Sequence, residues 1–209
     1  MIDARPKTRS NNRREKIFDA AALLFVEKGF GSTSVRDIAK ATGMLPGSLY
    51  YHFSSKEDLL TAVFEEGVKR ISESVDTALA NASQDPWERL QAASEAHLSA
   101  LLDGSNYAQV VVRILPSDVP GAEETLVLLR DEYESRFISL FNDLPIASDI
   151  DRSVQRLMLI GAMNHVPVWF RKGRDTPAGL AHKFISTLRY AQIGAEMTTT
   201  YDLSSGVKI

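Results

Sequence analysis

Apolar residues recur three and four positions apart along almost the whole chain, which is the spacing of one face of an α-helix. Beyond Ser55 no segment shows the alternation of apolar and polar residues that predicts a strand. The pattern predicts nine helices, at about residues 10–28, around 35–39, and over 45–51, 56–82, 86–102, 106–115, 122–142, 150–170 and 177–194. We therefore expect an all-α fold.

Residues that begin or end helices stand between these segments. Gly29 follows the first helix at a position that favours glycine, and Asp85-Pro86 supplies an N-cap followed by proline in the first turn. Ser148 or Asp149 is expected to cap the helix over 150–170.

The segment from Thr33 to Lys56 has the spacing of a helix-turn-helix. A small residue, Ala39, is followed four positions later by Gly43, where the turn between two helices needs a positive φ. Leu49, six residues further on, returns an apolar side chain to the same core. The second of these helices contains no acidic residue, as a surface facing DNA phosphates requires.

Polar groups around this motif are candidates for DNA contact. Gly47, Ser48 and Tyr50 are expected to face base edges, and hydroxyl, imidazole and ammonium donors follow to bind phosphates. The alternative for Tyr50, Tyr51 and Phe53 is that they are core aromatics. The full set of expected DNA-binding residues is Arg14, Thr33, Ser34, Arg36, Leu45, Gly47, Ser48, Tyr50, Tyr51, His52 and Lys56.

The segment from about Arg14 to Leu60 resembles the N-terminal domain of the TetR family of bacterial transcriptional regulators. The resemblance lies in the run TSVRDIA at 33–39, Gly43, the run GSLYYHF at 47–53, and Lys56. Leu45-Pro46 departs from the family, where a small polar residue and a lysine-like residue are more usual, so the operator of a relative cannot be assigned to this chain.

The resemblance implies two domains with different tasks. Residues 1–55 would hold an N-terminal arm and a three-helix DNA-binding domain, and 56–195 a six-helix domain for ligand binding and dimerisation. The arm at 1–10 is expected to be flexible, either disordered or lying along DNA, and 196–209 lacks a helical pattern and is expected to be a flexible tail.

Dimerisation in this family uses the last two long helices, which would form a four-helix bundle with those of a second copy. The helices here offer large and small apolar residues for it: Val154, Leu157, Met158, Gly161, Ala162, Leu180, Phe184 and Leu188. The alternative is that these residues form the core of a single copy. A two-fold homodimer would suit a palindromic operator in double-stranded DNA.

In relatives, a small-molecule effector binds in the helical body. Aromatic and polar candidates for such a pocket are Phe64, Trp87, His97, Tyr107, Arg113, Tyr133, Phe137, Met158, Asn164, His165 and Trp169, each of which has core packing as its alternative. The segment around Pro167 and Trp169 faintly resembles one ending in Trp-Tyr-Arg-Pro-Gly-Gly in regulators of acyl-CoA and steroid breakdown. A CoA thioester or hydrophobic acid is therefore one hypothesis for the ligand, although Lys172 and Arg174 depart from that ending.

Charge is distributed unevenly between the two ends of the chain. Residues 1–60 hold ten Lys or Arg against seven Asp or Glu, a net charge of +3, which leaves −6 for the other 149 residues. A basic N-terminal part is consistent with nucleic-acid binding. No segment approaches the roughly 18 apolar residues of a membrane span, the N-terminus does not resemble a secretory signal, and the absence of cysteine fits a cytoplasmic protein.

Catalytic and cofactor motifs are missing from the sequence. The histidines at 52, 97, 165 and 182 lack metal-ligand spacing, and no glycine-rich phosphate loop or nucleophile motif occurs. We expect neither an enzyme nor a cofactor or metal site. The sequence predicts a one-component transcriptional repressor, and the alternative is a helical ligand-binding or adaptor protein with an inactive DNA-binding head.

Overall fold

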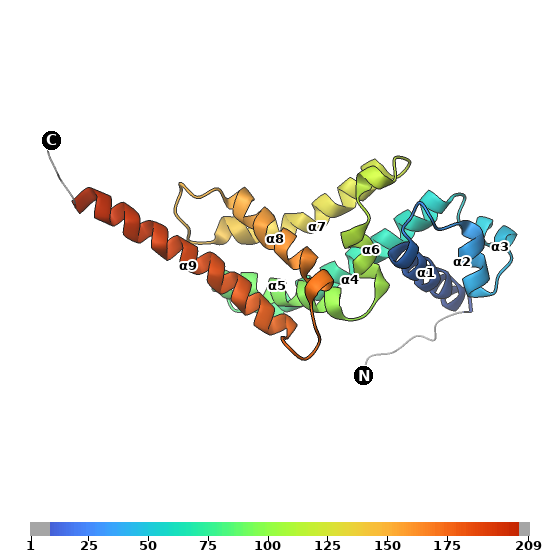
Figure 1. The fold of residues 1–209 in the computed structure, drawn as a ribbon, viewed down its shortest axis with the longest axis horizontal. Helices are drawn as coiled ribbons and strands as arrows, with labels where there is room; N and C mark the ends of the chain where they lie inside the picture. The colour runs from blue at the N-terminus through green and yellow to red at the C-terminus, as the bar shows by residue number, and fades with distance from the viewer. Residues whose placement is uncertain (1–8, 205–209) are drawn as a thin grey trace. The chain divides into compact units, whose positions relative to one another are not determined.

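The fold is all-α, as predicted. In a computed structural model, the backbone is described for residues 9–204 and the side chains for 12–190; residues 1–8 of the expected arm lie outside this range. Within it the chain forms nine α-helices, one short 3-10 helix and no strand (Figure 1). The helices are α1 (Arg9–Lys28), α2 (Val35–Thr42), α3 (Pro46–Tyr50), α4 (Lys56–Asn81), α5 (Pro86–Leu102), α6 (Asn106–Arg113), η1 (Pro116–Asp118), α7 (Glu123–Asp143), α8 (Arg152–Trp169) and α9 (Pro177–Ser204).

The helices group into two compact units. Unit 1 comprises Met1–Arg70 and Gly104–Glu132, and unit 2 comprises Ile71–Asp103 and Tyr133–Ile209. Because the divisions fall inside α4 and α7, both helices contribute residues to each unit.

Unit 1 is built around α1, which packs against α2 and α6, while α2 packs against α3. Apolar residues at helical spacing fill its core, and each is almost fully buried: Ile17, Phe25, Ile38, Leu49, Leu59, Leu60, Val63 and Phe64. The close approach of α4 to α6 requires glycine, because a Cβ on Gly67 would lie 2.7 Å from the Tyr107 carbonyl oxygen. The core therefore holds the helix-turn-helix on α1.

Unit 2 is built around α5, which packs against α8 and α9. Its core includes Leu90, Leu98, Phe137, Phe141, Met163, Val166 and Ile185. The Asp85 side chain accepts hydrogen bonds from the backbone N–H groups of Trp87 and Glu88, as expected of the N-cap of α5.

Two helix ends differ from the sequence prediction. Asp151, rather than Ser148 or Asp149, caps α8, because its carboxylate accepts from the N–H groups of Ser153 and Val154. Helix α9 continues to Ser204, beyond the end expected near residue 194, so 196–204 of the expected tail are helical, and 205–209 lie outside the described residues. No glycine or proline occurs between Ala195 and Ser204, so nothing in the sequence interrupts the helix there.

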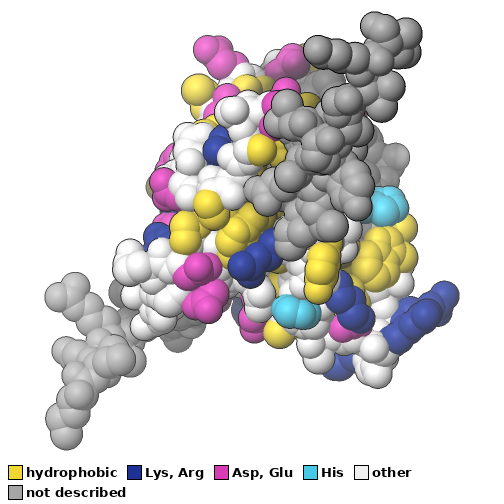
Figure 2. Space-filling view, turned by 90° about the vertical axis from the view of Figure 1, so that its left-hand side faces the viewer, with side chains coloured by type: hydrophobic (Ala, Val, Ile, Leu, Met, Phe, Trp, Pro, Cys, Tyr) yellow, Lys and Arg dark blue, Asp and Glu magenta, His cyan; other side chains and the backbone are white. Residues whose placement is uncertain are grey.

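Apolar side chains also reach the surface. Figure 2 shows one face on which hydrophobic side chains lie in groups among charged ones. Monomeric proteins expose single apolar residues routinely, whereas a contiguous group indicates a contact surface.

Candidate DNA-binding surface and ligand-binding body

A complete set of caps fixes the first helix of the motif. The Ser34 hydroxyl accepts from the Asp37 N–H, and the Asp37 carboxylate accepts from the Ser34 N–H at 2.9 Å, which forms a capping box. The Ser34 hydroxyl also donates to the Asp37 carboxylate at 2.6 Å, and this bond, with that from the Ser34 N–H, lowers the pKa of Asp37. At the other end Gly43 has a φ of 69°, so the glycine predicted for the turn is in the left-handed conformation.

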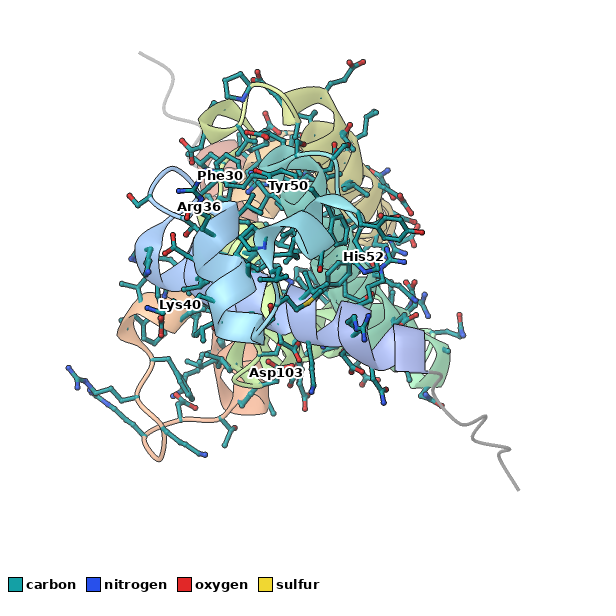
Figure 3. All side chains as sticks on the ribbon, turned by 90° about the vertical axis from the view of Figure 1, so that its right-hand side faces the viewer. Phe30, Arg36, Lys40, Tyr50, His52 and Asp103 are labelled. Atoms are coloured by element: carbon teal, nitrogen blue, oxygen red, sulfur yellow. The ribbon has the colours of Figure 1, made fainter. Side chains whose placement is uncertain are left out.

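The second helix of the motif, α3, is anchored by Leu49, which is buried. The residues around it face outward: Gly47, Ser48 and His52 are exposed, Leu45 is 76% exposed and Tyr51 is 87% exposed. Figure 3 shows this side of unit 1, with Arg36 and Lys40 on α2 and Tyr50 and His52 on and just after α3. The alternative of core aromatics therefore does not apply to Tyr50 and Tyr51, whereas Phe53 is half-buried with its ring 5.9 Å from that of Phe18.

Thr33 lies in the core rather than on the expected DNA-facing surface. Its side chain is buried, and its hydroxyl lies within hydrogen-bonding distance of the carbonyl oxygens of Leu24 and Gly29. These acceptors lie at and just beyond the end of α1, where carbonyl groups lack helical partners. Thr33 therefore holds the loop between α1 and α2 and has no hydroxyl available for a phosphate.

Lys56 is also engaged inside unit 1. Its ammonium donates to the carbonyl oxygens of Phe30 at 2.8 Å and Thr33 at 2.9 Å, and it lies 4.1 Å from the centre of the Phe30 ring. An ammonium has three N–H donors, so two are used within the fold. The structure thus gives Lys56 a role in closing the loop between α1 and α2.

Arg36 and Arg14 remain at the surface of unit 1. Among residues with described side chains, none forms an ion pair with Arg36, whereas its neighbour Asp37 is held by Ser34 and lies 4.0 Å from Lys28. Arg14 lies over the Phe18 ring at 5.1 Å. Both guanidinium groups are therefore open to an external anion.

A buried hydroxyl joins α6 to α1. Tyr107 is buried, and its hydroxyl donates to the Asp19 carboxylate at 2.7 Å. Burial raises the pKa of Tyr107, and the bond to Asp19 adds to the rise. The Arg70 guanidinium lies 4.0 Å from the centre of the same ring. Tyr107, a predicted pocket residue, thus connects two helices of unit 1 through a partner 88 residues away, which no local pattern predicts.

In unit 2, three predicted pocket residues, His97, Tyr133 and Asn164, form a buried polar cluster. His97 Nδ1 lies 2.6 Å from the Tyr133 hydroxyl, and His97 Nε2 lies 3.0 Å from Asn164 Oδ1. Because a carboxamide oxygen only accepts, Nε2 carries the proton and Nδ1 accepts from Tyr133. Burial lowers the pKa of His97 to about 4, so the ring is neutral at pH 7. Phe137, another predicted residue, packs its ring 6.1 Å from that of His97.

The other pocket candidates do not join this cluster. Trp87 is buried beneath the Arg189 guanidinium, while Met158, His165 and Trp169 are exposed on α8. Phe64, Tyr107 and Arg113 belong to unit 1, where Phe64 is fully buried and Arg113 bonds to Gln109.

Two adjoining cavities lie where α8 ends and α9 begins. One, of about 430 Å³, is lined by Trp169, Phe170, Arg171, Arg174, Asp175, Leu180, Lys183 and Phe184. The other, of about 660 Å³, is lined by Leu102, Phe170, Lys172, Gly173, Arg174, Asp175, Thr176 and Pro177. Of these residues the sequence predicts only Trp169 for the ligand pocket, and Leu180 and Phe184 for the dimer contact; the basic turn at 171–174 is the further signal it contains.

One side of α8 carries an exposed apolar stripe. Leu157 and Met158 are 54% and 64% exposed, and Val154, Gly161, Ala162 and Val168 are also at the surface. Of the residues expected on α9, Phe184 and Leu188 are half-buried, but Leu180 is buried in its own unit and is therefore unavailable to a second copy.

Within the described residues, no group of His, Asp and Glu has the arrangement of a metal site. In the same part of the chain, no helix is long and apolar enough to cross a membrane.

Comparison with known proteins finds relatives of both parts of the chain. Residues 17–63 match the family described as bacterial regulatory proteins, tetR family, and residues 83–191 match the tetracyclin repressor-like C-terminal domain. The transcriptional repressor KstR2 of Mycobacterium tuberculosis (strain H37Rv) is 39% identical over 106 residues, which are 49% of this chain and 50% of KstR2. The chain thus aligns with about half the length, or less, of the curated relatives it matches.

Solved structures extend the likeness to most of the chain. The superantigen PfiT is 30% identical with a TM-score of 0.70, over 86% of this chain and 97% of PfiT. AibR in complex with isovaleryl coenzyme A and operator DNA shares the fold at 22% identity and a TM-score of 0.73, over 84% of this chain and 97% of AibR. The two matched segments together span most of the sequence and confirm the resemblance first noted in residues 14–60: the chain belongs to the TetR family of bacterial regulatory proteins.

Proposed function

We propose that this protein is a transcriptional repressor that binds operator DNA through α2 and α3 and leaves it when a small molecule binds. The observation that carries the proposal is the capped helix-turn-helix, whose second helix presents an uncharged outer face beside the free Arg36 guanidinium. Its family membership and the similarity to KstR2 support the same function.

The proposed contacts divide by chemistry. Tyr51 and His52 would bind phosphates through single hydrogen bonds, and Arg14 and Arg36 would add charge. Ser34 is left out, because both its N–H and its hydroxyl donate to the Asp37 carboxylate. Leu45, Gly47, Ser48 and Tyr50 would lie toward the bases. Thr33 and Lys56 are left out of this set, because their polar groups are used within unit 1.

We place the dimer contact on the exposed stripe of α8. A leucine and a methionine more than half exposed, flanked by Gly161 and Ala162, give a surface on which another helix can pack closely. A two-fold dimer would present two copies of α3 to a palindromic site.

The effector we propose is an anionic molecule with an apolar part, with an acyl-CoA as the first to test. The two cavities beside the α8–α9 loop combine aromatic side chains with four cationic ones, while this part of the chain is acidic overall. Lys183 is paired with Asp175, which leaves Arg171, Lys172 and Arg174 at the surface for an anion. AibR, which shares the fold, was crystallised with isovaleryl coenzyme A.

The test of DNA binding is selection of duplexes from a random pool at two salt concentrations. We expect a palindromic consensus whose affinity falls steeply with salt, because phosphate contacts release counterions. Absence of any selected sequence would contradict the proposal and favour a ligand-binding or adaptor protein with an inactive head.

The effector is tested on the selected operator by titration with acyl-CoAs of increasing chain length. We expect an acyl-CoA to release the native protein from the operator. The Arg171→Ala, Arg174→Ala double variant should need a ligand concentration at least tenfold higher for the same release. Arg113→Ala, which removes an exposed arginine of unit 1, is the matched control. If all three proteins are released at the same ligand concentration, the ligand binds outside these two cavities.

A further inference from the structure

The segment that includes α3 lacks the side chains that form paired hydrogen bonds with a base. Residues 41–55 contain no Arg, Lys, Asn, Gln, Asp or Glu. Two hydrogen bonds to guanine require Arg or Lys, and two to adenine require Asn or Gln. Selectivity from this segment must therefore rest on single contacts from hydroxyl groups or the His52 ring, and on apolar contacts.

Leu45 is the aliphatic side chain of this segment that stands in solvent. It is 76% exposed, whereas Leu49 is buried and Met44 is half-buried. Leu45 is the residue before the first turn of α3, and residues at that end of a recognition helix lie nearest the base edges in the major groove. The apolar group that a base offers there is the 5-methyl group of thymine.

The backbone holds Leu45 in place before any contact forms. A residue that precedes proline is restricted to extended conformations, and Leu45 has φ −76° and ψ 143° before Pro46. Little backbone freedom remains to be lost on binding, so the contact would cost less backbone entropy than one from a flexible loop.

We propose that Leu45 is a specificity-determining residue that selects thymine at one position of each operator half-site through its 5-methyl group. This inference rests on the proposed function, since it needs a DNA-bound α3. It concerns the leucine side chain and not the N–H groups at the start of this five-residue helix.

The experiment replaces each thymine of the selected operator in turn by deoxyuridine, which removes only the methyl group. At one thymine per half-site we expect native affinity to fall about fourfold, the value of one buried methyl group, and about 15-fold when both half-sites are changed. Leu45→Ala should bind thymine and uracil duplexes equally at that position. Its salt dependence should match the native protein, since no phosphate contact is lost.

Leu128→Ala is the matched control, because Leu128 is an exposed leucine of α7 in unit 1. It should keep the full preference for thymine. Circular dichroism melts of both variants test whether they fold.

The outcomes separate this inference from the proposed function. Failure of the native protein to select any duplex would overturn the function itself. Selection of an operator in which no uracil substitution weakens binding, or in which Leu45→Ala keeps the thymine preference, would overturn the role of Leu45 alone.

Discussion

The Lys56 ammonium joins two carbonyl groups, those of Phe30 and Thr33, in the loop between α1 and α2. Hydrogen bonds from a charged donor stabilise a fold by more than neutral ones. Lys56→Met, which keeps the apolar stem and removes the charge, should lower the free energy of unfolding by about 1–2 kcal/mol. Chemical denaturation measures this.

DNA binding provides the contrasting measurement for Lys56. Since its ammonium is used inside unit 1, the salt dependence of operator affinity should be nearly unchanged in Lys56→Met. If the slope of log affinity against log salt concentration falls by the amount expected for one phosphate contact, Lys56 binds DNA after all. The exposed Arg36, changed to Met, should show that reduction.

His97 makes stability depend on pH. Its pKa is lowered to about 4 by burial, against 6.5 for the free side chain, so the unfolded chain binds the proton more readily. The contribution of neutral His97 to the free energy of unfolding is therefore fully present above about pH 6.5. It is lost as the pH falls toward 4, by up to about 3 kcal/mol. His97→Gln should show a shallower decline over this range in denaturant titrations, and an identical pH profile would contradict the assignment.

These side-chain roles mark the limit of what the sequence could predict. His97 and Asn164 stand out in the sequence as polar residues on apolar helices, and the fold brings them together, 67 positions apart. Thr33 and Lys56 are predicted to contact DNA because their types suit phosphate. Their true acceptors are main-chain carbonyls, which no pattern of side chains reveals.

At the scale of helices, caps made most boundaries predictable. Gly43 and the Asp85-Pro86 pair act through neighbours within a few residues, so local sequence determines them. The start of α8 offered three acidic or hydroxyl residues within four positions, and only the structure distinguishes Asp151 among them. No glycine or proline lies between Ala195 and Ser204, so the sequence does not mark where α9 ends.

Two glycines of the motif should respond oppositely to the same change. Gly43 has a positive φ, and a Cβ there would meet nothing within 4 Å. Gly43→Ala should therefore lower the free energy of unfolding by about 1 kcal/mol, because of backbone strain alone. Gly47 lies in α3 with open space around it, so Gly47→Ala should raise the free energy of unfolding by about 0.5 kcal/mol. Thermal unfolding of both variants gives the comparison, and equal shifts would contradict it.

At the scale of the whole molecule, the α8 stripe predicts the oligomeric state. Leu157→Arg places a charge in the middle of the proposed dimer contact and should give a monomer with at least tenfold weaker affinity for the palindromic operator. Sedimentation velocity measures the first effect and a binding titration the second. Leu128→Arg, on α7, should remain dimeric, and a dimeric Leu157→Arg would place the contact elsewhere.

The composition of unit 1 limits how the protein can be rearranged. The helix-turn-helix shares its compact unit with α6 and the first part of α7, and the Tyr107–Asp19 bond ties α6 to α1. A chimaera that joins residues 1–55 to another regulator would lack α6, the helix that packs against α1. Transplanting this DNA specificity onto a new sensor therefore requires a donor segment that includes α6, or a recipient helix redesigned to fit Asp19.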